Sequence, residues 1–495
     1  MASDKRRVAL PAAVCVLLLG LAGWRFSSCA EPNLSQPELA NAIFNGVNYA
    51  ALGLIGLGCL FWPGSSGGQD QRAVPVAAPQ TSHVGGGGIA YLANLKTFLT
   101  VVVVAHHASN QFGGPPIAMP IGTYAYDPRS PIGAAAGTDS FGVFSSALQA
   151  VDQMYFMSLF FLVSGIFCPA SLDNKGFRAF VLGKILRLGG PLAIFSIILG
   201  PATIAWTAHY GGVPVQWVYF AGPCWFILWL LNFSVAYAAL ATVVPKVVAP
   251  KPNPPMLLLL PPLVGLPLSL VFWGISAIPL DAAWGGPSGL GGMVFWSYGA
   301  AIYIPFFFAG ILAGRSDYLS VIERMPRWAA WALRAQALGL ISIIFLCVAQ
   351  YTIPIPSVRD AGNLNAEFFL NFAPPMYSVV MALTLIQFFH QHVNANNALS
   401  RWASSAAYGV YVTHVPIMSA LIIAFVEILN YGRDVAIFPF GWPVLAFFGV
   451  RGGQPVLLSD AILWGGFLFA FFATALICFP MCSLLRRAPV LDKML

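Results

Sequence analysis

Long apolar runs recur along almost the whole chain, and they restrict the fold more than any other feature. An α-helix needs about 20 mainly apolar residues to cross a bilayer. Twelve such runs occur, at 8–28, 40–62, 89–109, 153–170, 191–208, 223–244, 256–279, 294–314, 330–352, 368–390, 405–428 and 461–483. Because backbone polar groups cannot stay unpaired in hydrocarbon, each run is predicted to be a helix or a broken helix. The predicted fold class is therefore all-α, a polytopic transmembrane helical bundle.

Composition excludes a soluble protein of this length. Charged residues make up only 8% of the 495 residues and hydrophobic residues 58%, whereas about a quarter of the residues of a soluble domain are charged. The net charge of +7 comes from basic residues in short clusters between the apolar runs. This arrangement is typical of membrane topology rather than of a nucleic-acid surface, so the lipid bilayer is the predicted environment and no nucleic-acid partner is expected.

The positions of Lys and Arg predict the orientation of the bundle. With the N-terminus in the cytoplasm and twelve alternating spans, 19 of the 24 Lys and Arg residues fall on the cytoplasmic side. The five on the other side are Arg25, Arg129, Arg359, Arg433 and Arg451. Cytoplasmic loops of membrane proteins carry such an excess. The protein is therefore predicted to be multi-pass with both termini in the cytoplasm, in a membrane that the sequence does not identify.

Stretches rich in Gly, Pro and Ser predict the domain organisation. Residues 1–62 are expected to form an N-terminal membrane hairpin, although the first run also has the features of a cleavable signal sequence. Residues 63–88 are typical of a flexible linker. We expect a ten-span domain over 89–485 and a cytoplasmic tail over 486–495.

Two long loops are predicted on the far side of the membrane, over 110–152 and 429–460. Both are rich in Gly, Pro and aromatic residues, and we expect no regular structure in them. Long loops of this kind are often functional, so they are candidates to cover an acceptor site. The alternative is that they only connect the spans.

The third run carries the first candidates for chemistry, because ionisable side chains inside a membrane are costly. Lys96 lies near its start, and His106 and His107 lie near its end. Eleven residues make close to three helical turns, so Lys96 and His107 project to roughly the same side, about 16 Å apart. Imidazole is the side chain best suited to take a proton from an alcohol near neutral pH. The alternative is a pair of interfacial histidines at a helix end.

A basic segment follows the fourth run and contains Lys175, Arg178, Lys184 and Arg187. Such a segment either fixes topology and contacts anionic lipid, or holds the phosphates of a nucleotide-bearing donor. His414 lies inside a later run and is expected to face the interior of the bundle. No Walker-type loop, zinc motif or nucleophile elbow is present, so neither a bound cofactor nor a metal site is predicted.

Taken in order, these residues resemble the acyltransferase-3 family over roughly residues 90–485. Leu95-Lys96, ten residues and then His107 are similar to the family's Leu-Arg, ten residues and His, with His106 as the second choice. Five further stretches resemble family motifs in the expected order: Phe160–Gly165, Phe180–Pro191, Trp225–Leu228, Phe307–Ala313 and Tyr408–Pro416. Each motif is weak alone, but their common order is specific.

The resemblance implies a ten-helix core behind the hairpin, and an acyltransferase. Such an enzyme moves an acyl group, often acetyl from acetyl-CoA, to a hydroxyl of a carbohydrate or lipid-linked acceptor. His107 would act as general base or as a transient acyl carrier, with His106 and Lys96 beside it.

The same resemblance implies where the donor binds. Acyl-CoA would be a co-substrate whose phosphates contact Lys184, Arg187 and Arg178 at the cytoplasmic face. The cavity between donor and acceptor would be lined by Ser164, Trp225 and His414.

Departures from the family pattern keep two other functions open. Lys96 and Lys184 stand where Arg is usual, which keeps the charge but loses bidentate phosphate contact. Leu228 stands where many relatives carry Glu, and loss of that carboxylate would suit an inactive scaffold or receptor. A transporter without chemistry is the other alternative, although the two halves show no inverted repeat. The acyl group, the acceptor and the oligomeric state are not identified by the sequence.

Overall fold

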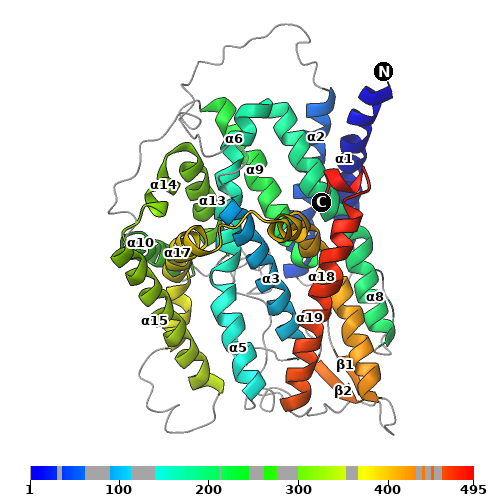
Figure 1. Ribbon diagram of the computed structural model, residues 1–495. Coiled ribbons are helices and arrows are strands. Elements are labelled where there is room, and N and C mark those ends of the chain that lie inside the picture. The colour runs from blue at the N-terminus through cyan, green and yellow to red at the C-terminus, as the bar shows by residue number, and fades with distance from the viewer. Residues whose placement is uncertain are drawn as a thin grey trace.

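A bundle of long helices forms the body of the protein (Figure 1). This computed structural model describes residues 2–30, 36–61, 90–112, 140–210, 215, 217, 219–244, 261–276, 299–352, 366–430, 437–440, 447–450 and 460–495. Helices dominate because each apolar run satisfies its own backbone hydrogen bonds. The predicted all-α helical bundle is confirmed.

The N-terminal hairpin consists of α1 (Ala2–Ser28) and α2 (Gln36–Phe61), which pack against each other. Its helices also contact the core, α1 through η1 and α7 and α2 through α6. Arg178 strengthens this contact by donating a hydrogen bond of 2.8 Å to the carbonyl oxygen of Leu60, near the end of α2. The hairpin therefore lies directly against the segment that carries the basic residues.

Helix α3 (Ala90–Phe112) passes through the centre of the bundle and contacts α5, α6, α17, α18 and α19 (Figure 1). The prediction of no regular structure over 110–152 was wrong in two respects. Helix α3 continues to Phe112, and α5 (Ser140–Gln153) forms at the end of the predicted loop. Polar residues recur along α5 and several of them are buried against protein. Such a helix lacks the continuous apolar run that identifies a lipid-facing span.

The chain from α6 to α8 is helical throughout, except for one reversal. It comprises α6 (Phe156–Lys184), the π-helix η1 (Ile185–Gly189), α7 (Gly190–Ile194), the π-helix η2 (Phe195–Leu199) and α8 (Gly200–Tyr210). The reversal occurs at Gly176, whose φ of 72° and ψ of 167° are accessible to glycine but rare for other residues. The basic segment is therefore helical on both sides of this turn, with Lys175 directly before Gly176 and Arg178, Lys184 and Arg187 after it.

The remaining helices complete the bundle. They are η3 (Gly222–Cys224), α9 (Trp225–Val243), α10 (Pro261–Ser276), α13 (Gly299–Arg315), α14 (Tyr318–Glu323), α15 (Arg327–Thr352), α17 (Ala366–His392), α18 (Ala398–Asn430), α19 (Asp460–Leu485) and η6 (Leu491–Lys493). Helix α18 packs against α3 and α19, and α13 packs against α6. These contacts bring helices from both halves of the chain around α3.

Two short strands lie in the segment 429–460, which the sequence predicted to be irregular. Strand β1 (Ile437–Phe440) pairs antiparallel with β2 (Phe447–Val450), with Ile437 opposite Val450. Both strands are rich in aromatic and β-branched residues, which favour extended structure. The irregular-loop prediction was therefore wrong here too.

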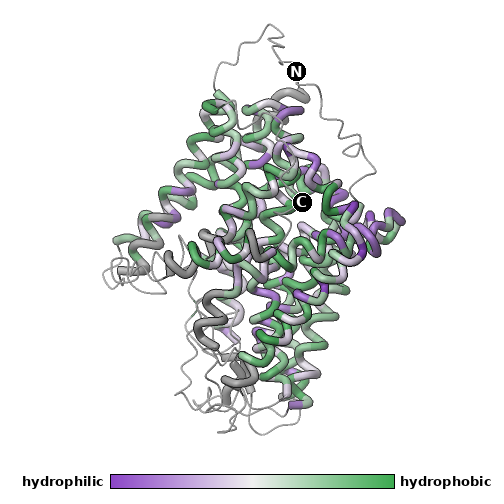
Figure 2. The backbone as a smooth tube through the Cα atoms, turned by 90° about the vertical axis from the view of Figure 1, so that its left-hand side faces the viewer, coloured by the Kyte–Doolittle hydropathy of each residue, from purple (hydrophilic) through white to green (hydrophobic). Residues whose placement is uncertain are grey.

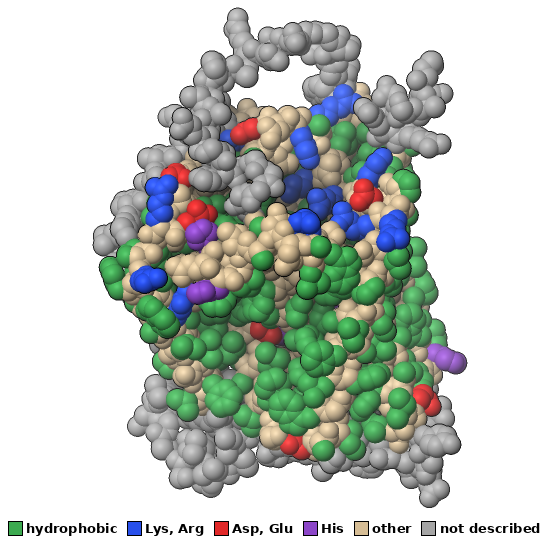
Figure 3. Space-filling model, in the orientation of Figure 1, with side chains coloured by type: hydrophobic (Ala, Val, Ile, Leu, Met, Phe, Trp, Pro, Cys, Tyr) green, Lys and Arg blue, Asp and Glu red, His purple; other side chains and the backbone are tan. Residues whose placement is uncertain are grey.

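Hydropathy along the bundle is that of an integral membrane protein (Figure 2). Six helical stretches of the described residues are long and apolar enough to cross a membrane: Ala9–Ser28, Ser140–Tyr210, Gly222–Val243, Arg327–Cys347, Ala398–Leu429 and Asp460–Leu485. Ser140–Tyr210 contains two of the predicted spans, and each of the other predicted spans also overlaps a helix. On the visible face, Lys and Arg gather in the upper half, above a broad band of hydrophobic side chains (Figure 3). The number of crossings remains a prediction.

Candidate active site

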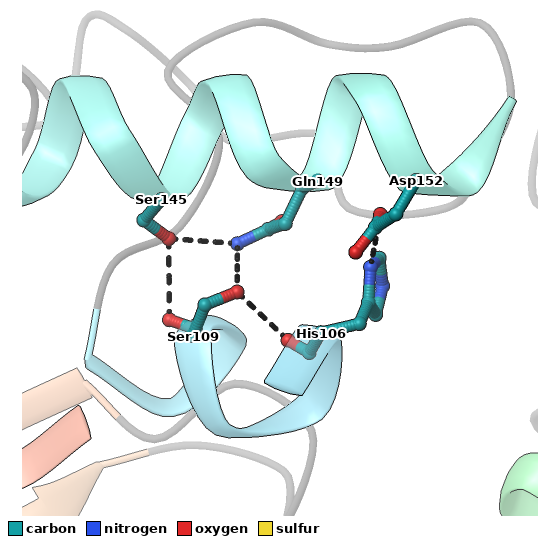
Figure 4. Close-up of polar contacts among 5 residues, drawn as sticks. All are labelled: His106, Ser109, Ser145, Gln149 and Asp152. Atoms are coloured by element: carbon teal, nitrogen blue, oxygen red, sulfur yellow. Dashed lines mark hydrogen bonds and ion pairs between the residues drawn. The ribbon is translucent and has the colours of Figure 1, made fainter. Parts of the chain in front are cut away.

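His106 and Asp152 form a buried pair between α3 and α5. Nδ1 of His106 lies 2.8 Å from Oδ1 of Asp152, and the two residues are 8% and 2% exposed (Figure 4). When the Asp152 carboxylate is ionised it only accepts hydrogen bonds, and in that state Nδ1 of His106 donates its proton to Oδ1. This fixes the ring and leaves Nε2 as its second functional atom. A carboxylate that orients an imidazole in this way is a recurring device of enzymes that transfer acyl groups.

A small hydrogen-bond network sets the alignment of α3 with α5 (Figure 4). The Ser109 hydroxyl donates to the carbonyl oxygen of His106 at 2.8 Å, and the Ser145 hydroxyl donates to the carbonyl oxygen of Ser109 at 3.2 Å. The Gln149 amide donates to the hydroxyl oxygens of Ser109 at 3.4 Å and Ser145 at 2.9 Å. Because these bonds involve buried groups on both helices, sliding one helix along the other would leave several of them unpaired.

His107 brings a third helix to the cluster. Its ring centroid lies 5.1 Å from that of His414 on α18 and 5.4 Å from that of His106, the latter in an edge-to-face arrangement. His107 is partly exposed, whereas His414 is fully buried. The three imidazoles and the Asp152 carboxylate therefore form one group, which we call the histidine cluster.

The tautomer of His414 follows from its contacts. Its Nδ1 lies 2.7 Å from the carbonyl oxygen of Tyr411 and 3.2 Å from that of Val410. Since carbonyl oxygens only accept, Nδ1 carries the proton. Its Nε2 is buried and contacts no hydrogen-bonding group in the described part of the chain. A buried imidazole nitrogen without a protein partner costs free energy, and Nε2 can accept a hydrogen bond from a bound group.

Lys96, Lys184 and Arg187 gather at the other end of α3, and we call them the basic cluster. Lys96 lies within electrostatic range of Arg187 and Lys184, and its ammonium is 4.7 Å from the centre of the Phe167 ring. Nζ of Lys184 lies 3.6 Å from Sγ of Cys168. None of these three cations forms an ion pair with a carboxylate among the residues that the structure describes. Three close cations without counter-charges favour an anionic ligand.

The two clusters are connected along two helices. On α3, Lys96 and His107 lie eleven residues apart, which is about 16 Å. On α18, the Tyr408 hydroxyl donates to the carbonyl oxygen of Arg187 at 3.0 Å, and His414 follows six residues later, about 9 Å along the helix. Both helices therefore run from the basic cluster to the histidine cluster.

The structure places the other predicted site residues less centrally. Arg178 donates its hydrogen bond to the Leu60 carbonyl oxygen at the hairpin contact and forms no ion pair with the carboxylates that the structure describes. Trp225 begins α9, and its ring centroid lies 5.6 Å from that of Tyr303. Ser164 precedes Gly165, where α6 meets α13. Leu228, the departure that the sequence comparison with the family motif noted, is buried among apolar side chains.

Two of the motifs that the sequence singled out are explained by helix packing. A methyl group built on Gly165 would clash with the carbonyl oxygen of Phe307, and one on Gly310 would clash with that of Leu162. The motif stretches Phe160–Gly165 and Phe307–Ala313 therefore meet where the backbones of α6 and α13 are in close contact. Small residues at such crossings are the usual means of close packing in membranes.

Asp152 is the residue that sequence reasoning missed. It lies at the end of a stretch that was predicted to be a loop, and its partner is 46 residues away. One signal was available, because Ser145, Gln149 and Asp152 follow a spacing of four and three residues. That spacing places them on one face of a helix.

Comparison with known proteins agrees with this arrangement. The family model described as an acyltransferase domain matches residues 89–483. The chain belongs to the acyltransferase-3 family. No curated protein and no solved structure matches the chain in the corresponding comparisons. This family member is thus a membrane acyltransferase, and its family favours an enzyme over a transporter or an inactive scaffold.

Proposed function

We propose that this acyltransferase moves an acyl group, in the first instance acetyl, from acyl-CoA to a hydroxyl group. The observation that carries the proposal is the placement of two clusters on one face of α3, the basic cluster at one end and the histidine cluster about 16 Å away. Coenzyme A has phosphates at one end and its thioester at the other end of a long arm. A donor with this shape suits both clusters at once.

Lys184 and Arg187, with Lys96, would bind the phosphates, since none of the three has a carboxylate partner in the described part of the chain. We place this end of the bundle at the cytoplasmic face, where the excess of Lys and Arg predicts it to be. The acceptor would then approach the histidine cluster from the other side. A carbohydrate or a lipid-linked acceptor suits this route, because both present hydroxyl groups.

His107 would contact the reactants, because it is the partly exposed member of the histidine cluster and shares the face of Lys96. It takes the proton of the acceptor hydroxyl as the acceptor oxygen attacks the thioester carbonyl carbon. The bond between this carbon and sulfur then breaks. The departing CoA thiolate takes the proton from the His107 imidazolium, which restores the neutral ring.

The test uses purified full-length protein in proteoliposomes with acetyl-CoA and a mixed extract of glycans and lipids. The expected result is release of free CoA thiol together with a new acyl ester on the acceptor. His107→Ala should abolish this turnover while CoA binding and protein abundance stay unchanged. Retained turnover in His107→Ala would overturn the assignment of His107. Movement of a substrate across the membrane without thiol release would instead support the transporter.

The acceptor is best identified in cells. Glycan and lipid profiles of cells with and without the protein should differ by one missing acyl ester. The mass of the missing group identifies the acyl chain, and the molecule that carries it identifies the acceptor class.

A further inference from the structure

Asp152 stands out among the described acidic residues, because it is 2% exposed and pairs with the imidazole of His106. A buried carboxylate is costly in a membrane protein and usually has a function. The other described carboxylates that form ion pairs contact arginines, Asp173 with Arg315 and Asp492 with Arg486. In the described part of the chain, Asp152 is the carboxylate paired with a histidine.

The helix that carries Asp152 is anchored at both ends. At its start, the Asp460 carboxylate of α19 accepts hydrogen bonds from the Ser140 hydroxyl at 2.5 Å and the Phe141 amide at 2.8 Å. Beyond its end, the Ser378 hydroxyl of α17 donates to the carbonyl oxygen of Met154. Between these ends, the serine and glutamine network fixes its alignment with α3. Hydrogen bonds from three other helices therefore hold α5, and those from α3 and α17 lie nearest to Asp152, whereas the Asp460 contact lies at the opposite end of the helix.

The geometry points to Asp152 as a positioning residue that acts on His107 through His106, an inference that rests on the proposed function. Asp152 binds Nδ1 of His106 and so fixes the tautomer and the plane of that ring. The planes of the His106 and His107 rings meet at 88°, edge to face. The His107 ring also contacts the His414 ring, and the angle between those two planes is 36°. His107 is thus held between two rings whose orientations are each set by a hydrogen bond.

Electrostatics adds to the effect of position. His107 gains a positive charge when it takes the proton of the acceptor hydroxyl. The negative charge of Asp152 lies one imidazole away and is shielded from water, so it stabilises that charge more than an exposed carboxylate would. Leu228 on α9 is buried among apolar side chains, whereas Asp152 brings a carboxylate to the histidine cluster from α5.

The variant Asp152→Asn tests this inference, because it keeps the size of the side chain and removes its charge. We expect kcat to fall about 10²- to 10⁴-fold, in the range seen when a carboxylate that orients a catalytic histidine is neutralised. KM for acetyl-CoA and direct CoA binding should stay the same, since the basic cluster is untouched. Asp152→Glu, which restores the charge, should recover part of kcat.

The matched control is Asp460→Asn, the other carboxylate that binds α5. Loss of this helix-end contact should lower thermal stability, by about 1 kcal/mol, with kcat per folded molecule unchanged. If Asp152→Asn behaves like Asp460→Asn, Asp152 is only structural and the inference is wrong.

A double-mutant cycle gives the second test. His106→Gln alone should lower kcat to a similar degree, and the double variant Asp152→Asn/His106→Gln should lose little more than either single variant. Additive losses would overturn the inference. The variant Asp152→Asn could fail to fold. In that case His106→Gln alone tests the inference, and a full kcat in this variant would overturn it. If His107→Ala retains turnover, the assignment of His107 as the base is wrong, and this inference fails with it. If His107→Ala loses turnover while Asp152→Asn keeps its full kcat, this inference alone is wrong.

Discussion

Gly165 of α6 and Gly310 of α13 meet backbone to backbone. A Cβ atom at Gly310 would lie 3.0 Å from Cα of Gly165 and would clash with the carbonyl oxygen of Leu162. Gly314, one turn further, has the same relation to the carbonyl oxygen of Ile166. The atoms next to these glycines belong to the backbone of the opposite helix and cannot rotate away as a side chain can. A larger residue would therefore push the two helices apart.

Gly310→Ala is therefore expected to destabilise the protein by about 1–3 kcal/mol, as for other overpacked sites. The measurement is thermal unfolding in detergent, followed by the fluorescence of the protein. The control is Gly339→Ala in α15, where an added methyl group has no neighbour within 4 Å. That variant should keep or slightly raise the melting temperature. Equal melting temperatures for the two variants would contradict the close packing of α6 and α13.

The N-terminal hairpin offers a second prediction. The hydroxyls of Tyr49 on α2 and Tyr219 before α9 lie 2.5 Å apart, and the Arg25 guanidinium lies 4.5 Å from the centre of the Tyr219 ring. Tyr49→Phe and Tyr219→Phe should each lower stability by about 1 kcal/mol, because each removes the hydrogen bond between the two hydroxyls. The double variant should lose no more than one single variant, since both lose the same bond.

Thermal unfolding of the wild type, the two single variants and the double variant measures the coupling free energy between the two hydroxyls. Tyr318→Phe serves as control, because its hydroxyl makes no hydrogen bond in the part of the chain that the structure describes. Additive losses for Tyr49→Phe and Tyr219→Phe would show that the two hydroxyls do not share a bond.

The sequence predicted the positions of the long helices well, because hydrophobicity identifies segments that face lipid; the same reason explains which elements it missed. Apolar runs report exposure to lipid, so every predicted span overlaps a helix. Helix α5 escaped prediction because Ser145, Gln149 and Asp152 turn toward protein, where polar groups can be paired. The strands β1 and β2 were missed because they are only four residues each, inside a segment rich in Gly and Pro.

The site was predicted only in part, because its parts come from distant segments. Spacing along one helix was enough to place Lys96 and His107 on the same side. Contacts between helices cannot be read from one sequence, so neither the pairing of His106 with Asp152 nor the packing of His107 on His414 was predicted. Charge alone also did not distinguish Arg178, which binds a backbone carbonyl, from Arg187.

The third prediction concerns the basic cluster. Lys184→Ala and Arg187→Ala should each raise KM for acetyl-CoA about tenfold or more, because a hydrogen bond between charged groups contributes about 1.5–3 kcal/mol. The value of kcat should change less, since the chemistry takes place at the other end of α3. Lys184→Arg restores the family's usual residue and should bind the donor at least as well.

Steady-state kinetics and direct CoA binding measure these effects. Arg487→Ala is the control, because it removes the same charge from an exposed residue after α19. The same rise in KM in all three alanine variants would mean that general attraction, rather than contact, accounts for donor binding. That general attraction would also weaken with salt in every variant alike.

The last prediction concerns Leu228, where the resemblance to the family motif leads us to expect Glu. Leu228 is 6% exposed and packs in the apolar core beside Phe226 and Leu231. Leu228→Glu should therefore bury a carboxyl group without a prepared partner, which costs a few kcal/mol and lowers the yield of folded protein. Leu228→Met, of similar volume, should fold normally. We expect no gain in kcat for the folded fraction of Leu228→Glu, because Asp152 already provides the carboxylate of the histidine cluster. A rise in kcat would mean that the site lacks an acid on α9, and that Asp152 does not replace it.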